Sequence, residues 1–195
     1  ATFIAALIGE LGLDRPVLVG TSLGGHVAAA IASQGLAAPR GLVLVGATGL
    51  FPIGPEACQR LAKRAVDRSL QGTRSKAETV FFDRAHVTDA FVHEEHRINN
   101  SPGSDGVFAK LAEYFVGQLD RDAVGSTLAA MPARPPIELV WGAADRSVPI
   151  ANGREAARLL APTPLHVIEN AAHAPYFEQP EPFNQLLQRF LGSVF

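Results

Sequence analysis

The stretch Gly20-Thr21-Ser22-Leu23-Gly24 fits the pattern G-x-S-x-G, and its neighbours decide the fold. The run before it, 16–20, is short and rich in β-branched residues, which is typical of a strand buried in a parallel sheet. The alanine-rich run after it, 26–34, is predicted to be a helix. A serine between a strand and a helix lies on a sharp turn that small neighbours allow. The sequence therefore makes Ser22 a candidate nucleophile.

Strand and helix alternate on either side of this turn. Strands are expected at 16–20, 42–46, 137–142 and 165–169. Helices are expected over 2–11, 26–34, about 152–161, and from near Pro182 towards the end. Short links between strand, helix and strand produce right-handed crossovers in a parallel sheet. We therefore predict an α/β fold with parallel strands and flanking helices.

Residues 51–130 interrupt this rhythm. They contain no run typical of a buried strand and carry more charge than their flanks. Helices are expected there over 55–70, 75–83, 88–99, 105–119 and 121–130. We predict an α/β core at 1–50, a helical insertion at 51–130, and a return to the core at 131–195.

Composition excludes several classes of protein. The 195 residues are 47% hydrophobic with a formal net charge of −2, which favours a globular core and argues against nucleic-acid binding. No apolar run is long enough to cross a membrane. The single cysteine, Cys58, forms no internal disulfide. His93 and His96 flank two glutamates, but the run does not match a zinc motif, so we expect no metal and no cofactor. A small-molecule substrate is the expected partner.

Two further polar residues follow later strands. Asp145 comes just after the strand over 137–142, and His173 comes just after the strand over 165–169. Because the carboxyl ends of parallel strands lie at one edge of a sheet, both residues are expected near Ser22. A serine hydroxyl needs a base to become nucleophilic, and the base needs a carboxylate to orient it. The order serine, acid, histidine therefore predicts nucleophilic catalysis.

Three segments resemble the α/β-hydrolase superfamily of serine hydrolases with a helical cap: Gly20–Gly25, Val140–Pro149 and His173–Phe183. The resemblance spans the chain, although the insertion matches only loosely. It implies that the insertion at 51–130 is the cap.

The resemblance also assigns roles. It implies that Ser22 is the nucleophile, His173 the general base and Asp145 the acid that orients it. The backbone N–H of Leu23 is expected to stabilise the oxyanion. Val148, shortly after Asp145, is a candidate for substrate binding.

The start of the chain departs from this family. Members usually carry about four strands before the turn with the serine, and a His-Gly loop that gives a second oxyanion donor. The sequence instead begins inside a predicted helix at Ala1, without a methionine or a signal peptide. We interpret it as the C-terminal part of a longer cytoplasmic protein, weakly active or inactive alone.

The substrate is predicted to be a carboxylester with a small or medium apolar acyl group. The alternatives are a C–C bond hydrolase of ring-cleavage products, a perhydrolase or thioesterase, and a non-catalytic ligand-binding homologue. The segment 87–92 is similar to the corresponding cap segment of the C–C hydrolases. However, those enzymes commonly have tryptophan after the catalytic histidine, where this chain has Ala174. They also have Arg-Trp in the cap, where it has Glu95-His96.

Overall fold

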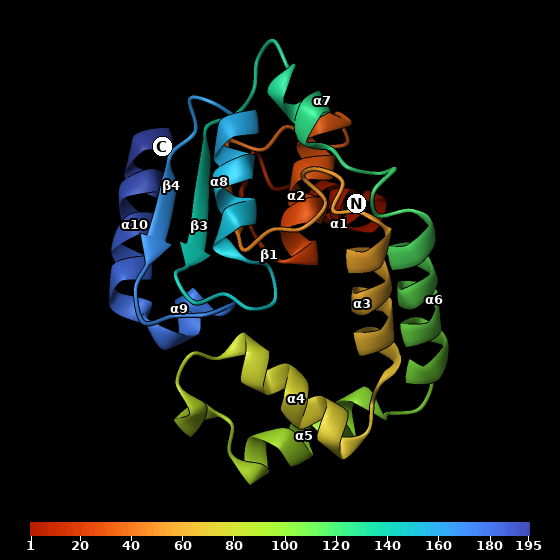
Figure 1. Cartoon of the computed structure of the whole chain (residues 1–195). Helices are drawn as coiled ribbons and strands as arrows, with labels where there is room; N and C mark the ends of the chain where they lie inside the picture. Colours follow the sequence, from red (N-terminus) through yellow and green to blue (C-terminus); the bar gives the residue numbers. More distant parts are fainter.

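Four parallel strands form one sheet in the order β1-β2-β3-β4 in the computed structural model, which describes residues 1–195. Their bounds are β1 Val17–Thr21, β2 Gly41–Val45, β3 Ile137–Gly142 and β4 Leu165–Ile168. Each strand lies within one residue of its predicted position. The parallel sheet with flanking helices confirms the predicted α/β fold (Figure 1).

The rest of the regular structure is helical. The helices are α1 Thr2–Glu10, α2 Leu23–Ser33, α3 Pro55–Val66, α4 Leu70–Val80, the short 3₁₀-helix η1 Arg84–His86, α5 Asp89–Asn99, α6 Ser104–Gly117, α7 Gly125–Ala129, α8 Ile150–Leu159, α9 Pro175–Glu178 and α10 Pro180–Val194. The helix expected over 55–70 ends earlier, at Val66, and the helix expected over 75–83 begins earlier, at Leu70, because Ser69 caps α4 by accepting from the Gly72 N–H. No helix is both long enough and apolar enough to cross a membrane.

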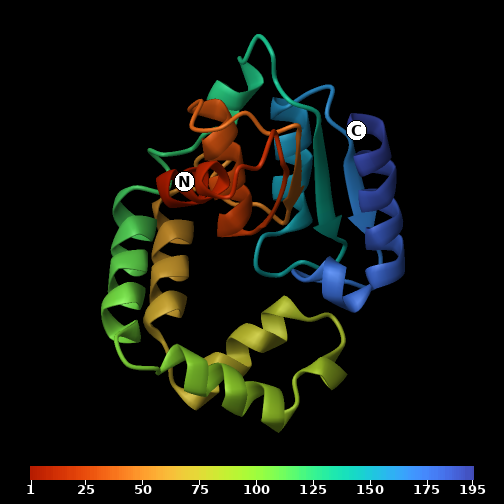
Figure 2. The ribbon, with the colours of Figure 1, turned by 180° about the vertical axis from the view of Figure 1, so that it is seen from behind.

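Helices cover the sheet on two sides. On one face, α2, α7 and α8 pack around Leu42, Leu44, Leu139 and Trp141. On the other face, α10 packs around Val43, Val45 and Val140 through Phe183, Leu186 and Phe190. Because side chains alternate along a strand, each buried strand supplies both cores. Figure 2 shows α10 and α8 on either side of β3 and β4.

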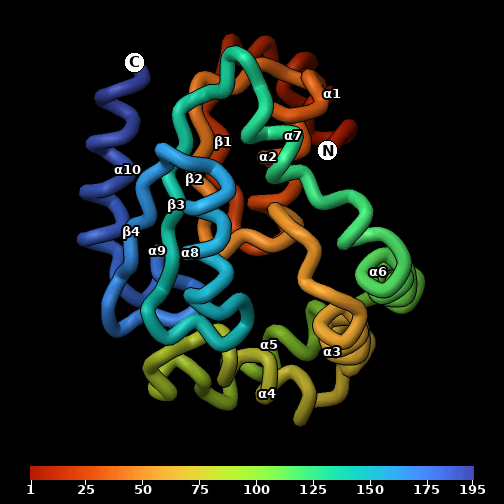
Figure 3. Tube along the Cα trace, turned by 45° about the horizontal axis from the view of Figure 1, so that its top comes forward, coloured from red at the N-terminus to blue at the C-terminus, as the bar shows by residue number.

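The helices α3–α6 lie beyond the carboxyl ends of the strands (Figure 1). The pair α3 and α6 runs side by side and connects the core to α4 and α5, as the trace in Figure 3 also shows. The last helix of the predicted insertion behaves differently, because α7 packs against α2 and α8 and places Leu128 in the core. The carboxyl ends of the strands therefore point towards the helices α3–α6.

The N-terminal edge of the sheet is less covered. Helix α1 buries only Ile8, while Phe3 and Leu11 are exposed by 76% and 61%. Val19 of β1, the first strand of the sheet, is also half exposed.

Candidate active site

Ser22 occupies the turn between β1 and α2 in a strained conformation. Its φ is 52° and its ψ is −120°, a region that residues with a side chain rarely adopt. Its N–H donates to the Val45 carbonyl at 2.9 Å, which ties the turn to β2. A Cβ atom at Gly20 would lie 2.3 Å from the Gly24 carbonyl oxygen, and one at Gly25 would lie 2.5 Å from the Ala47 Cβ. The glycines therefore allow the close approach that holds Ser22 at the strand end.

Asp145 follows β3 and is almost fully buried. Its Oδ1 accepts hydrogen bonds from the N–H groups of Ser147 and Val148, both at 2.8 Å. Its Oδ2 lies 2.7 Å from Nδ1 of His173. The loop from Asp145 to Val148 is also held to β3, because the indole N–H of Trp141 donates to the Val148 carbonyl at 2.9 Å. The carboxylate is thus held in one orientation by three donors.

His173 follows β4, and its imidazole reaches Asp145 across the ends of β3 and β4. Its backbone N–H donates to the carbonyl of Val80, at the end of α4, at 2.9 Å. One cavity of about 290 Å³ is lined by both Ser22 and His173. The structure therefore brings the three residues predicted from the sequence to one edge of the sheet.

The two other predicted site residues border the same cavity. Leu23 is the first residue of α2, so its N–H has no carbonyl acceptor within the helix. Val148 is buried and lines the cavity beside Ser147. Six apolar residues of α3, α4 and α6 also line the cavity: Leu61, Ala65, Val80, Phe108, Leu111 and Phe115. Its polar wall includes Thr48, Arg64, Lys76 and Asn99. Of the aromatic residues in the insertion, Phe108 and Phe115 thus line the cavity, whereas Phe81 packs against Phe91 and Phe177.

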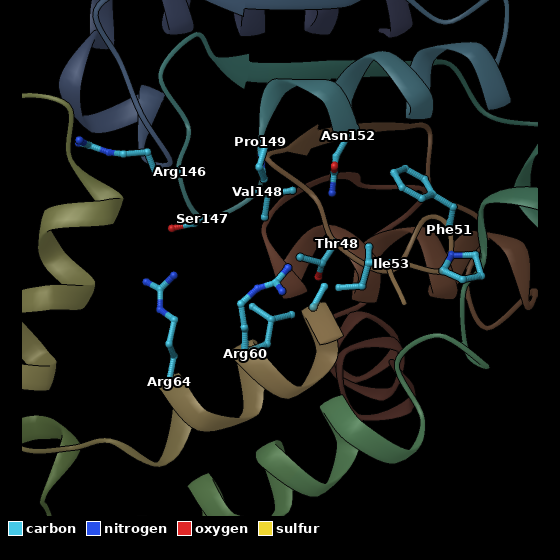
Figure 4. A pocket seen from close by; sticks show the side chains of 13 residues that line it. Thr48, Phe51, Ile53, Arg60, Arg64, Arg146, Ser147, Val148, Pro149 and Asn152 are labelled. Atoms are coloured by element: carbon cyan, nitrogen blue, oxygen red, sulfur yellow. The ribbon is translucent and has the colours of Figure 1, made fainter. Parts of the chain in front are cut away.

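A second cavity, of about 600 Å³, adjoins the first. Its wall includes Arg60 and Arg64 of α3, Thr48 after β2, and Asn152 of α8 (Figure 4). The two cavities share five lining residues: Thr48, Leu61, Arg64, Ser147 and Val148. The sequence did not single out Thr48 or the two arginines, because nothing in their local pattern shows that they meet at this site.

The remaining histidines and the cysteine lie elsewhere. Burial lowers the pKa of His26, whose Nε2–H donates to the Asp122 carbonyl at 3.0 Å. His166 contacts Glu138 across β3 and β4. Cys58 is buried in α3, and burial raises its thiol pKa, which disfavours the reactive thiolate. No group of three or more histidine, cysteine, aspartate or glutamate residues is placed to hold a metal ion.

The model of the alpha/beta hydrolase family matches residues 1–186. The chain belongs to the alpha/beta hydrolase family. This match confirms the resemblance seen in the three sequence segments. The relatives described next are hydrolases and esterases, and they confirm that this alpha/beta hydrolase is an enzyme of the hydrolase class.

Relatives of this alpha/beta hydrolase include enzymes of two kinds. It is 31% identical over 204 residues to 2-hydroxy-6-oxononadienedioate/2-hydroxy-6-oxononatrienedioate hydrolase 2 of Pseudomonas putida, covering 98% of this chain and 68% of the relative. The meta-cleavage product hydrolase of Pseudomonas fluorescens superimposes with a TM-score of 0.86 at 23% identity, over 98% of this chain and 70% of that one. A thermophilic esterase from Thermogutta terrifontis superimposes with a TM-score of 0.73 at 25% identity, over the same shares.

Proposed function

We propose that this chain is a serine hydrolase that cleaves a small carbonyl compound through an acyl-enzyme on Ser22. The observation that carries the proposal is the 2.7 Å hydrogen bond between His173 and Asp145 beside the cavity that Ser22 lines. The strained backbone at Ser22 supports it, because strain of this kind clusters at functional sites.

We infer the position of the proton on His173 from the hydrogen bonds on Asp145. Asp145 accepts from two backbone N–H groups through Oδ1, so its carboxylate acts as an acceptor. The hydrogen of the Asp145–His173 bond then belongs to Nδ1 of His173. This leaves Nε2 with a free lone pair, which is the form a general base needs.

The mechanism follows from this arrangement. Ser22 Oγ attacks the substrate carbonyl carbon while His173 Nε2 takes the hydroxyl proton. Asp145 stabilises the imidazolium that forms, and the Leu23 N–H at the start of α2 donates to the oxyanion. Collapse of the tetrahedral intermediate transfers the proton from His173 to the leaving group and leaves the acyl group on Ser22. Water that His173 activates then releases the acid.

A carboxylester is the substrate that the residues favour. The first cavity is mainly apolar, which suits a small or medium acyl chain, and Val148 contributes to its wall. Ala174 and the pair Glu95-His96 stand where C–C hydrolases commonly have aromatic and arginine residues. The esterase from Thermogutta terrifontis, at 25% identity, supports the same choice. A thioester would fit the same chemistry.

Hydrolysis of a C–C bond in a ring-cleavage product is the second candidate. The relative from Pseudomonas putida and its counterpart in Escherichia coli K12, 29% identical over 202 residues, both carry names of hydrolases that act on an oxo-dienedioate. The reaction uses a carbonyl next to the bond that breaks, so the same serine, histidine and aspartate would serve it.

Fluorophosphonate labelling read by intact mass tests the proposal. We expect one adduct, absent in Ser22→Ala and retained in Ser126→Ala, which removes an exposed serine on α7. An adduct that persists in Ser22→Ala, or no adduct on a folded sample, would contradict it. A non-catalytic ligand-binding homologue would give no Ser22 adduct.

Unlabelled enzyme can then be offered both kinds of substrate. Release of p-nitrophenol from p-nitrophenyl esters supports the ester proposal. Loss of the visible absorbance of a 2-hydroxy-6-oxo-dienoate, without ester turnover, supports the C–C candidate instead.

A further inference from the structure

The second cavity has an unusual balance of charge. Its 13 lining residues include Arg60, Arg64 and Arg146, and none of them is aspartate or glutamate. Arginines at a protein surface are commonly paired with carboxylates, as Arg158 is with Glu155 on α8 of this chain. The cavity therefore concentrates positive charge without a matching acidic group on its wall.

Two of the three guanidinium groups are directed into the cavity. Figure 4 shows Arg60 and Arg64 extending from α3 towards Thr48 and Ser147, whereas Arg146 points away from them. Arg146 donates to the carbonyl of Phe81 at 2.7 Å and is thus used in holding the cap. Arg64 donates only to the Thr79 hydroxyl, and Arg60 makes no side-chain hydrogen bond or ion pair. Most of the donors on Arg60 and Arg64 therefore remain free.

Two carboxylates of the neighbouring segments, Asp120 and Asp67, are used by other partners. Asp120 accepts from the N–H groups of Ile53 and Gly54 at 2.8 and 2.9 Å. Asp67, beyond Arg64, accepts from the N–H and the hydroxyl of Ser69. Neither carboxylate forms an ion pair with Arg60 or Arg64, and Glu56, one helical turn before Arg60 on α3, forms none either. An anion from outside the chain can therefore take the free donors of these side chains.

A buried hydroxyl marks the boundary between the two cavities. Thr48 is 9% exposed, lines both cavities, and its Oγ1 has no hydrogen-bond partner. A buried hydroxyl without a partner is unfavourable, so a polar ligand group at this position would satisfy it. This observation is independent of the arginines and points to the same place.

We propose that Arg60 and Arg64 form a carboxylate-binding subsite, and that the substrate carries a free carboxylate in addition to the carbonyl that Ser22 attacks. The planar guanidinium group matches a carboxylate with two parallel hydrogen bonds. Because the cavities share Arg64 and Thr48, one molecule can extend from Ser22 to the arginines. The substrate class is thus a half-ester of a dicarboxylic acid or a comparable acidic carbonyl compound. This inference rests on the proposed function.

Turnover of matched esters tests the subsite. The probes are p-nitrophenyl hydrogen adipate, which is charged, and methyl p-nitrophenyl adipate, which is neutral. We expect the wild-type kcat/KM to be higher for the charged ester, and the ratio of the two values to fall about 10-fold in Arg60→Ala. Arg154→Ala, an exposed arginine on α8 outside both cavities, controls for net charge and should keep the wild-type ratio. Equal values for both esters, or a ratio unchanged in Arg60→Ala, would overturn the proposal.

A binding measurement separates this proposal from the catalytic one. In a Ser22→Ala background, calorimetry compares the affinity for adipate with the affinity for hexanoate. We expect adipate to bind more tightly, and Arg60→Ala and Arg64→Lys each to weaken adipate binding. If adipate binds no better than hexanoate while wild-type Ser22 is labelled, the subsite is wrong and the proposed function stands. If adipate is preferred but Ser22 is not labelled, the reverse holds.

Discussion

The backbone of Gly46 lies directly against the imidazole of His173. A Cβ atom on Gly46 would stand 3.1 Å from His173 Nδ1 and 3.1 Å from Asp145 Oδ2. Gly46 also has a φ of 50°, which disfavours any residue with a side chain. Gly46, directly after β2, therefore packs against the hydrogen bond between Asp145 and His173, which orients the proposed base.

Gly46→Ala is expected to displace His173 while the fold is retained. The added methyl group forces the imidazole or the carboxylate to move by a few tenths of an ångström, and misplacement of a base lowers the rate steeply. We expect the rate of fluorophosphonate labelling to fall by about 10-fold. Gly192→Ala, where a Cβ atom meets nothing within 4 Å, is the control and should react like the wild type. A normal rate in Gly46→Ala would show that the site tolerates this contact.

Asp145→Asn tests the orientation of the imidazole. Asparagine still accepts from the Ser147 and Val148 N–H groups through its oxygen, so the loop is retained, but its NH₂ group then faces His173 Nδ1. The histidine must adopt the other tautomer, which places a hydrogen on Nε2 and removes the base. We expect kcat to fall by roughly 10³- to 10⁴-fold with little change in melting temperature. Asp14→Asn, an exposed carboxylate far along the chain from the loop, should change neither quantity. Retained activity in Asp145→Asn would remove Asp145 from the mechanism.

The sequence predicts best what local pattern determines. The β-branched runs of β1–β4 identify the sheet, because a strand buried on both faces has no polar alternation. The convergence of Ser22, Asp145 and His173 could be predicted because each follows a strand, and strand ends lie at one edge of a parallel sheet. The break between α3 and α4 was predicted a few residues too late, although Ser69, which caps α4, is a residue type that commonly caps helices.

Features that depend on tertiary contacts could not be read from local pattern. Thr48 and Arg60 are ordinary residues in their own segments, and they line one cavity only because α3 lies beyond the carboxyl ends of the strands. The short helix α7 was predicted within the insertion because it is separated from β3 by prolines. In the structure Leu128 is fully buried in the core between α2 and α8. The packing of Leu128 against α2 and α8 determines the place of α7 in the fold, and the spacing of apolar residues along the sequence cannot predict such a contact.

Glu178 joins the segment that follows α4 to the loop that carries His173. Its Oε1 accepts from the N–H groups of Phe82 and Asp83, at 2.6 and 3.1 Å, and its Oε2 accepts from the Ala172 N–H at 2.8 Å. Ala172 directly precedes His173. In the segment that Glu178 contacts, the Val80 carbonyl accepts from the His173 N–H and the Phe81 carbonyl accepts from the Arg146 guanidinium. One carboxylate thus links two segments that border the active site.

Glu178→Gln is expected to loosen this link. The amide can accept on one side only, so its NH₂ group opposes an N–H donor on the other side. We expect a loss of about 1–3 kcal/mol in the free energy of unfolding. We also expect KM for p-nitrophenyl esters to rise more than kcat falls, because α4 forms part of the substrate cavity. Glu181→Gln, an exposed residue in the first turn of α10, is the matched control. Equal denaturant midpoints for the two variants would contradict the linking role.

His26 resists protonation inside the fold. It is buried on α2, burial lowers its pKa from 6.5, and its Nε2–H donates to the Asp122 carbonyl. A Cβ atom at Gly49 would lie 2.3 Å from His26 Nδ1, so the ring is enclosed on that side as well. The unfolded chain can protonate this imidazole freely, whereas the folded chain resists protonation.

The stability of the protein should therefore fall in mild acid. Below pH 6.5 the unfolded chain binds more protons than the folded chain, so the stabilisation from neutral His26 is present above that pH and is lost as the pH falls through the lowered folded pKa. We expect the melting temperature to drop between about pH 7 and about pH 5, and to drop less in His26→Gln. His93→Gln, an exposed histidine on α5, should follow the wild-type slope. If His26→Gln and the wild type lose the same number of degrees, the protonation of other groups governs the acid response and His26 does not.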